Sequence, residues 1–187
     1  MSHVQASIAQ AAQTMESLRP LESDILRAAA LVKSCLGQGG KLLACGNGGS
    51  AGDAADFTTE YVCRFVNDRR PFPAMNLTAD GSLLTAIGND YGFQEVFARQ
   101  VRGFGKTGDI VIALSTSGRS RNIVRALEEA GRLQLGSIAL LGKDGGDAKG
   151  LATIDLVVPS EVTARIQEAH KFILHLICEL VDPSLRG

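Results

Sequence analysis

The sequence has almost no net charge and no long apolar segment. Its 187 residues carry 19 Lys and Arg against 20 Asp and Glu, for a formal net charge of -1. Without a basic excess, nothing in the composition indicates a nucleic-acid partner or an acidic membrane surface. No stretch approaches the roughly 18 apolar residues that span a bilayer, and no basic segment followed by an apolar run predicts a signal peptide. These absences predict a cytoplasmic protein with neither nucleic-acid nor membrane partners.

The sequence also lacks paired cysteines. None of its four cysteines belongs to a Cys-x-x-Cys motif, and all have apolar neighbours: Cys35, Cys45, Cys63 and Cys178. We therefore expect buried, reduced thiols rather than a redox or metal site. Reduced thiols also agree with a cytoplasmic location.

Short apolar segments alternate with segments of helical periodicity. The expected strands span residues 41–45, 73–77, 109–114, 137–141 and 154–158, and the main expected helices span 50–65, 119–133 and 162–180. Residues 1–36 are expected to form one or two helices packed on this unit. Apolar strands alternating with helices are typical of a parallel sheet covered on both faces. The sequence predicts one α/β domain over residues 1–187, with a doubly wound five-stranded parallel sheet.

Two loops at predicted strand ends are rich in small polar residues. They are GNGGS (46–50) and STSGRS (115–120), and each precedes a helix. Free N–H groups at a helix start favour phosphate, glycines allow close approach, and hydroxyls add donors. Ordinary helix caps are the alternative interpretation, although four hydroxyls in the second loop exceed what a cap needs. Since neither loop matches a nucleotide fingerprint, we expect a small phosphorylated ligand rather than ATP or NAD.

Motifs along nearly the whole chain resemble one family. CGNGGSAGDA, IGNDYGF, LSTSGRS, LLGKDGG, VPSEVTARIQEAH and LHLICEL are similar, in this order, to motifs of the sedoheptulose 7-phosphate isomerases. These are the bacterial phosphoheptose isomerases of the sugar isomerase (SIS) fold. The resemblance implies a homotetramer with active sites at subunit interfaces. It also implies conversion of D-sedoheptulose 7-phosphate to D-glycero-D-manno-heptose 7-phosphate, the first step of nucleotide-activated heptose synthesis.

The same resemblance assigns the site residues. For the substrate phosphate it implies Ser115, Thr116, Ser117 and Ser120. For the sugar it implies Asn47, Gly48, Gly49, Asn89, Asp90, Glu60 and Gln167. It implies that Glu60 and His175 are catalytic. Where members of the family bind zinc, the matching ligand positions are Asp56, Glu60, Gln167 and His175.

The spacing of these side chains is compatible with isomerase chemistry. Moving a proton between neighbouring carbons needs a base and an acid, and a metal can polarise the oxygens. Asp56 and Glu60 are four residues apart on a predicted helix and project from one face. The alternative is a solvated acidic face with an ion pair between Glu60 and Arg64. On the last helix, periodicity does not choose between His170 and His175, and the resemblance chooses His175.

Two positions depart from the family pattern. Asp56 stands where the family usually has histidine, and the chain has only three histidines to offer. Aspartate can ligate zinc, but two carboxylates, an amide and an imidazole favour harder ions. We expect a bound divalent metal, with zinc, Mn²⁺ or no stable metal as the open outcomes. Arg119 replaces a more usual asparagine, and either adds charge at the phosphate or faces solvent.

Some polar and aromatic residues have structural alternatives. A carboxylate in the first turn of a helix is favoured by the helix dipole, so a structural role is expected for Asp53. Tyr61, Phe65 and Phe172 are expected in the core or an interface. The alternatives to this enzyme are a non-catalytic scaffold that binds a replication initiator, a sugar-phosphate sensor and an isomerase of another sugar phosphate. That scaffold branch lacks the equivalents of Glu60 and His175, which favours the enzyme.

Overall fold

Five parallel strands form the central sheet of the structure, a computed structural model that describes residues 1–185. The strands are β1 (Leu42–Cys45), β2 (Ala74–Asn76), β3 (Ile110–Ser115), β4 (Gly136–Gly142) and β5 (Ile154–Val158). Their order is β2-β1-β3-β4-β5, and every neighbouring pair is parallel. The order reverses between β1 and β3, which opens a crevice at the carboxyl ends of these strands. The predicted sheet is confirmed, and its strand ends differ by at most one residue.

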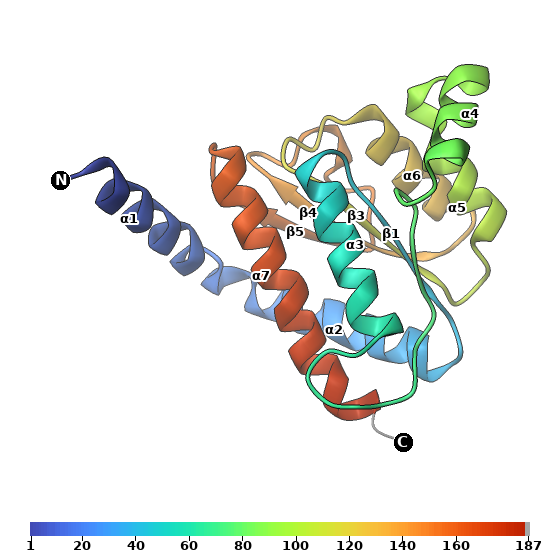
Figure 1. The fold of residues 1–187 in the computed structure, drawn as a ribbon, viewed down its shortest axis with the longest axis horizontal. Helices are drawn as coiled ribbons and strands as arrows, with labels where there is room; N and C mark the ends of the chain where they lie inside the picture. The colour runs from blue at the N-terminus through green and yellow to red at the C-terminus, as the bar shows by residue number, and fades with distance from the viewer. Residues whose placement is uncertain (186–187) are drawn as a thin grey trace.

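Helices cover both faces of the sheet (Figure 1). One face packs against α2 (Glu22–Gly37), α3 (Gly49–Val62) and α7 (Thr163–Val181). The other packs against α4 (Gly81–Tyr91), α5 (Ala98–Phe104) and α6 (Arg121–Arg132). Every residue of β3 is buried, as expected for a central strand covered from both sides. In the described part of the chain, no helix is long and apolar enough to span a membrane.

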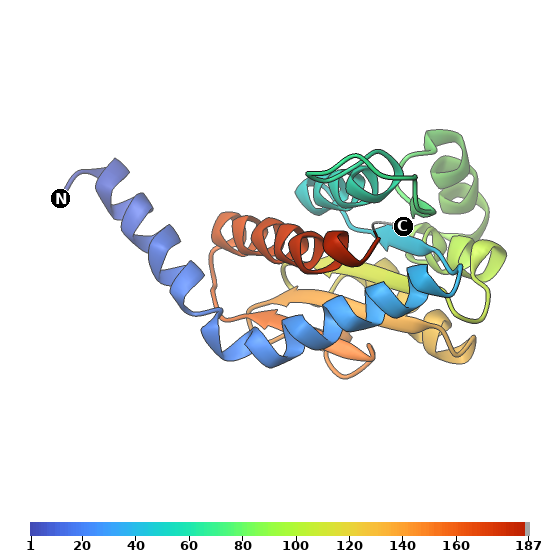
Figure 2. The same ribbon diagram turned by 90° about the horizontal axis from the view of Figure 1, so that it is seen from below.

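The N-terminal extension divides into two helices with different surroundings. α2 packs on the sheet through its apolar face. α1 (His3–Glu16) points away from the rest of the molecule in both views (Figures 1 and 2). The Arg165 guanidinium at the start of α7 donates to the Ser7 carbonyl at 2.9 Å. Val4 and Ile8 remain 66% and 64% exposed, so the extension packs on the domain mainly through α2.

Helix α3 ends earlier than its periodicity suggests. It stops at Val62 instead of continuing to Phe65, and Cys63 forms its C-cap. The Cys63 thiol is exposed, whereas the other three cysteines are buried as expected. Arg64 lies beyond the helix, where its guanidinium donates to the Val66 carbonyl at 3.1 Å. The alternative ion pair between Glu60 and Arg64 does not form within residues 1–185. The helix that would bring the two side chains together ends at Val62, before Arg64.

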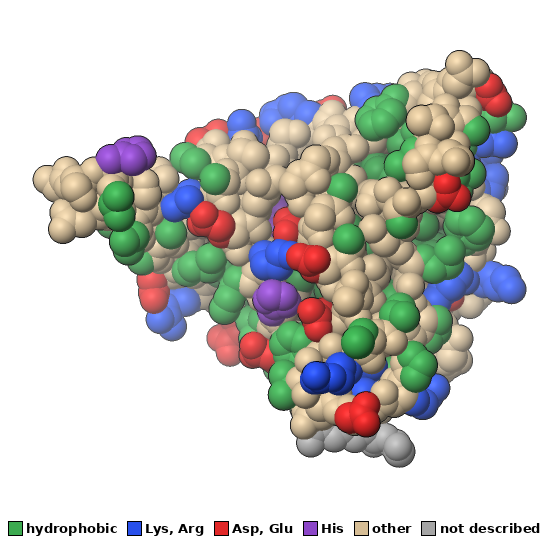
Figure 3. Space-filling model, in the orientation of Figure 1, with side chains coloured by type: hydrophobic (Ala, Val, Ile, Leu, Met, Phe, Trp, Pro, Cys, Tyr) green, Lys and Arg blue, Asp and Glu red, His purple; other side chains and the backbone are tan. Residues whose placement is uncertain are grey.

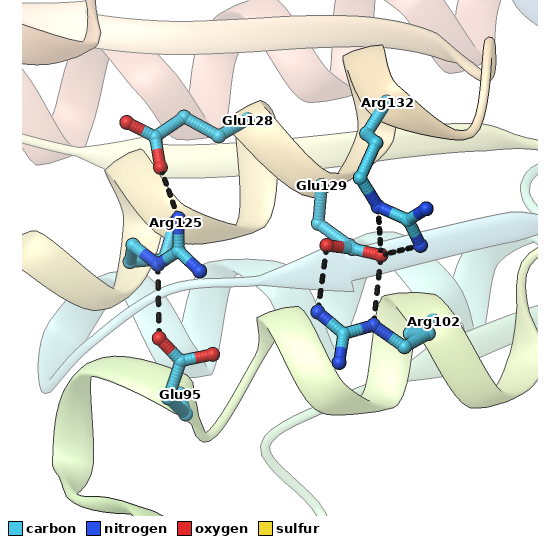
Figure 4. Close-up of polar contacts among 6 residues, drawn as sticks. All are labelled: Glu95, Arg102, Arg125, Glu128, Glu129 and Arg132. Atoms are coloured by element: carbon cyan, nitrogen blue, oxygen red, sulfur yellow. Dashed lines mark hydrogen bonds and ion pairs between the residues drawn. The ribbon is translucent and has the colours of Figure 1, made fainter.

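Ion pairs hold α6 against the neighbouring helical segments (Figure 4). Arg125 of α6 donates to Glu95 of the 3-10 turn η2 (Phe93–Glu95) at 2.9 Å. The Glu129 carboxylate is 4% exposed and accepts from Arg102 of α5 and from Arg132. These hydrogen bonds lower the pKa of Glu129 to about 2. The contacts fix α6 and η2, which border the crevice at the switch point.

Candidate functional site

The loops after β1 and β3 are joined at the switch point. The Asn47 amide donates to Asn122 at 2.9 Å, and the Asn122 amide donates back to Asn47 at 2.8 Å. A pocket of about 570 Å³ opens beside this pair, and its lining is Asn47, Phe93, Gln94, Ser120, Arg121 and Asn122. The sequence placed two phosphate-favouring loops at strand ends, and the fold places them side by side.

The serine-rich loop is shaped by its own hydroxyls. The Ser115 hydroxyl accepts the Gly118 N–H at 3.1 Å and lies 3.3 Å from the Ser120 oxygen. The backbone at Gly118 has φ 64°, and an added Cβ would come within 1.8 Å of the Gly145 carbonyl oxygen. Only glycine permits this approach. The turn after β4 therefore backs the loop, while Thr116 remains half-buried at its surface.

The Arg119 guanidinium donates to the Ser117 carbonyl of its own loop at 3.3 Å and extends to Asp144 after β4. Its side chain is 53% exposed and pairs with Asp144 at 2.6 Å. Of the two alternatives for this residue, the structure supports a solvent-facing one, with Asp144 as the partner.

A second pocket lies where α3 and α7 run side by side (Figures 1 and 2). It measures about 530 Å³ and is lined by Gly49, Asp53, Ala164, Gln167, Glu168 and Lys171. A Cβ at Gly49 would lie 2.4 Å from Gln167 Nε2. This contact explains the glycine at residue 49, since any side chain there would displace Gln167.

Lys171 connects the two helices electrostatically. Its ammonium lies 3.2 Å from Asp53 Oδ1 and contacts Asp56 Oδ2. In Figure 3, acidic, basic and histidine side chains meet over α3 and α7. Burial raises the pKa of Asp53, although Lys171 opposes this rise. For Lys171 itself, burial lowers the pKa, but the hydrogen bonds to Asp56 and Asp53 outweigh burial and raise it overall. α3 begins at Gly49 and has no acidic residue in its first turn, so the expectation that the helix dipole favours Asp53 is wrong. The structural partner of Asp53 is Lys171 instead.

Glu60 and His175 lie further along the same pair of helices. Glu60 is half-buried and lies one turn after Asp56 on α3, on the side of the helix from which Asp56 contacts Lys171 of α7. His175 is half-buried, one turn after Lys171, and its ring lies 6.1 Å from the ring of Phe65. His175 also acts on the pKa of Asp53 through its charge. By helical spacing, Glu60 lies on the side of α3 that carries Asp56, and His175 lies on the side of α7 that carries Lys171.

His170 is excluded from this surface. It is fully buried, and its Nε2 atom lies 3.0 Å from the Leu141 carbonyl oxygen. Burial lowers its pKa to about 4. His170 has a structural environment beneath β4, in agreement with the choice of His175 from the resemblance.

The donors expected to hold a metal do not form a ligand set. Within residues 1–185, no group of three or more His, Cys, Asp or Glu side chains is arranged to hold an ion. Asp56 instead contacts the Lys171 ammonium, and Gln167 lies against Gly49. A cation between two carboxylates opposes a second cation at the same place. The residues present therefore do not fit the expected divalent metal.

Asn89 and Asp90 lie apart from both pockets. They are exposed on α4, where the Asn89 amide donates to the Asp90 carboxylate at 2.8 Å. Neither lines the pocket beside Asn47, although the nearby Phe93 and Gln94 do. Within one subunit, the fold does not bring this pair to the other predicted sugar contacts.

The aromatic residues fall in three environments. Tyr61 is buried against Phe57. Phe65 is partly buried and packs on the core. Phe172 is 47% exposed and borders an apolar groove between α2 and α7. A core position is thus confirmed for Tyr61 and, in part, for Phe65, whereas Phe172 is a surface residue of this subunit.

Several residues of the two pockets were not predicted from the sequence. Lys171 and Asn122 make the contacts that join separate segments, and Arg121 lines the pocket beside Ser120. Lys171 carries one signal that could have identified it. It lies four residues after Gln167 and four before His175, on the same side of a helix.

Comparisons with known proteins bear on the family and the fold of the chain. The model of the SIS domain family matches residues 7–142. A phosphoheptose isomerase of Nitratiruptor sp. is 46% identical over 98% of this chain and 99% of its own. One of Shewanella loihica is 43% identical over 99% of this chain and 96% of its own. The structure of a phosphoheptose isomerase from Francisella tularensis superposes with a TM-score of 0.92 at 40% identity, covering 96% of both chains.

Proposed function

Because the chain belongs to the phosphoheptose isomerases, a family of SIS-domain proteins, we propose that it converts D-sedoheptulose 7-phosphate to D-glycero-D-manno-heptose 7-phosphate. It is an aldose–ketose isomerase of heptose synthesis. The observation that carries the proposal is that neighbouring residues at the start of α3 line two separate pockets. Asn47 lines one and Gly49, two residues later, lines the other.

An extended sugar phosphate fits this pair of pockets. Ser120 and Arg121 stand at the pocket that opens at the start of α6, where hydroxyl, guanidinium and helix N–H groups favour phosphate. Ser115, Thr116 and Ser117 complete that loop in the proposal. Gly48, Gly49 and Gln167 then contact the sugar toward its carbonyl end, which lies at the facing sides of α3 and α7.

The reaction moves one proton between carbons and one between oxygens. Glu60 takes the proton from C1 of the ketose and returns it to C2 of the enediol, and His175 carries a proton from O1 to O2. The atoms of the sugar are unchanged in number, so no co-reactant is required. The helical spacing of Glu60 from Asp56 and of His175 from Lys171 supports these roles, because Asp56 and Lys171 are in contact between α3 and α7.

The divalent metal expected from the sequence has no part in these steps. When bound, such an ion polarises the oxygens of the sugar, and its ligands would be Asp56, Glu60, Gln167 and His175. The contact between Asp56 and Lys171 argues against this set, so no step above uses a metal. Metal analysis of protein purified without chelators tests the expectation.

A homotetramer accounts for the apolar surface near α1. The groove between α1, α2 and α7 measures about 630 Å³, and its apolar lining is Met15, Leu18, Ile25, Leu26, Phe172, Leu176 and Leu180. The projecting face of α1 adds Val4 and Ile8. Exposed apolar surface of this kind is typical of an interface. In a tetramer, Asn89 and Asp90 would reach the site of a neighbouring subunit, which supplies the sugar contacts that one subunit does not assemble. We propose a cytoplasmic location for this assembly.

The alternatives are weaker. A scaffold that binds a replication initiator, or a sugar-phosphate sensor, has no use for the two proton-transfer groups Glu60 and His175. The close relatives named above are isomerases by name. An isomerase of another sugar phosphate would differ only in substrate.

One assay tests the proposal directly. Purified protein is mixed with sedoheptulose 7-phosphate, and the product is followed by phosphorus NMR with and without added Zn²⁺ or Mn²⁺. Formation of an aldoheptose 7-phosphate is expected. Binding of the sugar phosphate without conversion under any metal would favour a sensor, a scaffold or another substrate.

A further inference from the structure

The Lys171 side chain lines the pocket between α3 and α7, together with Gly49 and Gln167. Its ammonium contacts Asp53 and Asp56 on the opposite helix. An ammonium has three N–H donors, and over residues 1–185 only these two carboxylates accept from it. One donor therefore remains for a ligand in the pocket.

We propose that Lys171 is a catalytic residue that donates to the reacting oxygens of the sugar and takes the electrophilic role of a metal ion. This inference rests on the proposed isomerase function. Lys171 stays protonated throughout and transfers no proton. The C1 and oxygen protons move through Glu60 and His175, as above. The ammonium stabilises the negative charge that develops on the sugar oxygen during enediol formation.

The position of Lys171 along α7 supports this role. Gln167 lies one turn before it and His175 one turn after it, so by helical spacing all three lie on the side of α7 that faces α3. The amide of Gln167 is placed to orient the sugar, and His175 is placed to serve its oxygens. A fixed positive charge between these two side chains lies where the carbonyl end of an extended substrate is expected.

The surroundings of Lys171 also disfavour a metal at this place. Asp53 is 8% exposed, and a carboxylate so buried requires a counter-charge. Lys171 provides it and engages Asp56 at the same time. Asp56 and Lys171 thus form an ion pair. In this pair the Lys171 ammonium takes the place of the divalent metal ion expected beside Asp56.

The main alternative is that Lys171 only neutralises Asp53. Two variants separate these roles. Lys171→Met removes the charge and leaves Asp53 unpaired, whereas the double variant Asp53→Asn/Lys171→Met also removes the buried carboxylate. Thermal denaturation of both reports stability independently of turnover.

We expect Lys171→Met to lower kcat by about 100- to 1000-fold, the usual effect of losing one oxyanion donor, with a smaller change in KM. The double variant should recover the melting temperature of the wild type but not its kcat. Recovery of both stability and kcat in the double variant would show a purely structural lysine and overturn the proposal.

Metal content gives a second, independent readout. Wild-type protein supplied with Zn²⁺ should retain well under one ion per chain after gel filtration, and its turnover should survive EDTA. Asp56→His combined with Lys171→Leu should retain zinc, since this change supplies an imidazole and removes the competing charge. One tightly held ion per wild-type chain, with turnover lost in EDTA, would refute the role of Lys171.

The two proposals fail in distinguishable ways. Wild-type protein that converts no sedoheptulose 7-phosphate overturns the proposed function. The zinc content of the wild type and of the Asp56→His/Lys171→Leu variant still decides whether Lys171 takes the place of the metal. Turnover by the wild type that is unchanged in Lys171→Met overturns the inference and leaves the isomerase function intact.

Discussion

The side-chain amides of Asn47 and Asn122 hydrogen-bond to each other in both directions, at 2.9 and 2.8 Å. Asn122 is 3% exposed and lies in the first turn of α6, whereas Asn47 lies in the loop after β1. The pair thus links the two sides of the crevice between the carboxyl ends of β1 and β3. Its position ties the phosphate loop to the sugar loop.

Replacing Asn122 by Ala should loosen the loop around Asn47. We expect KM for the sugar phosphate to rise about 10-fold, because an amide left without its partner costs about 1–3 kcal/mol and its loop moves. Steady-state kinetics measures this change. Gln38→Ala is the control, since the exposed Gln38 amide donates to the Ser34 hydroxyl on α2, far from both pockets that carry the proposal. An unchanged KM in Asn122→Ala would contradict a role for the pair in binding.

Glu60→Gln and His175→Gln should each lower turnover by about 100-fold or more, because each removes a group that moves a proton. Neither change should unfold the protein, since Glu60 and His175 are both only half-buried. Kinetics and circular dichroism together check the prediction. Near-normal turnover by a folded variant would remove that residue from the mechanism.

Gly118→Ala should disable the serine-rich loop. The added Cβ would meet the Gly145 carbonyl oxygen at 1.8 Å, and φ at this residue is 64°. We expect a loss of about 2 kcal/mol or more in the free energy of unfolding, together with weaker binding of the substrate. Urea denaturation measures the first effect and inorganic-phosphate competition the second.

Gly131→Ala is the matched control for that change. A Cβ at Gly131 would meet no atom within 4 Å, and the residue lies in α6. Alanine in a helix is favoured over glycine by up to about 1 kcal/mol, so the melting temperature should not fall. Equal destabilisation by both variants would show that the contact with Gly145 is not the cause.

His170 should make the protein less stable in mild acid. Burial lowers its pKa from 6.5 to about 4 in the folded state, so between these values the unfolded chain binds the proton and the folded chain does not. This contribution is fully present above pH 6.5 and is lost as the pH falls to 4. Its size is on the order of 3 kcal/mol. Urea denaturation from pH 7 to 4 should show a shallower decline for His170→Gln than for the wild type, and identical slopes would contradict the assignment.

Phe172→Glu should dissociate the assembly. Phe172 is 47% exposed at the apolar groove, and a charge in a buried interface is costly. Gel filtration with light scattering should show a tetramer for the wild type and a smaller species for the variant. Leu151→Glu, at an exposed leucine outside the groove, should keep the wild-type mass. A monomeric wild type would end the tetramer proposal.

The order of strands and helices was predictable from the sequence, because apolar runs and glycine-rich turns are signals that extend over only a few residues. The two loops near Asn47 and Ser115 were also identified, since small polar residues at strand ends are a local signal. The length of α3 was not predicted correctly. Apolar residues continue at helical spacing through Phe65, but the helix ends at Val62. Periodicity alone does not predict where such a helix ends.

By itself the sequence determined the α/β class, the parallel sheet and the positions of the candidate loops. Only the tertiary structure decided which helical side chains meet. Lys171 and Asp56 are 115 positions apart in the chain, and Asn47 and Asn122 are 75 apart. Such contacts depend on how α3, α6 and α7 cross the sheet, which is set by packing across the whole domain rather than by local spacing. For the same reason the fold, and not the spacing of donors, placed an ammonium where a metal was expected.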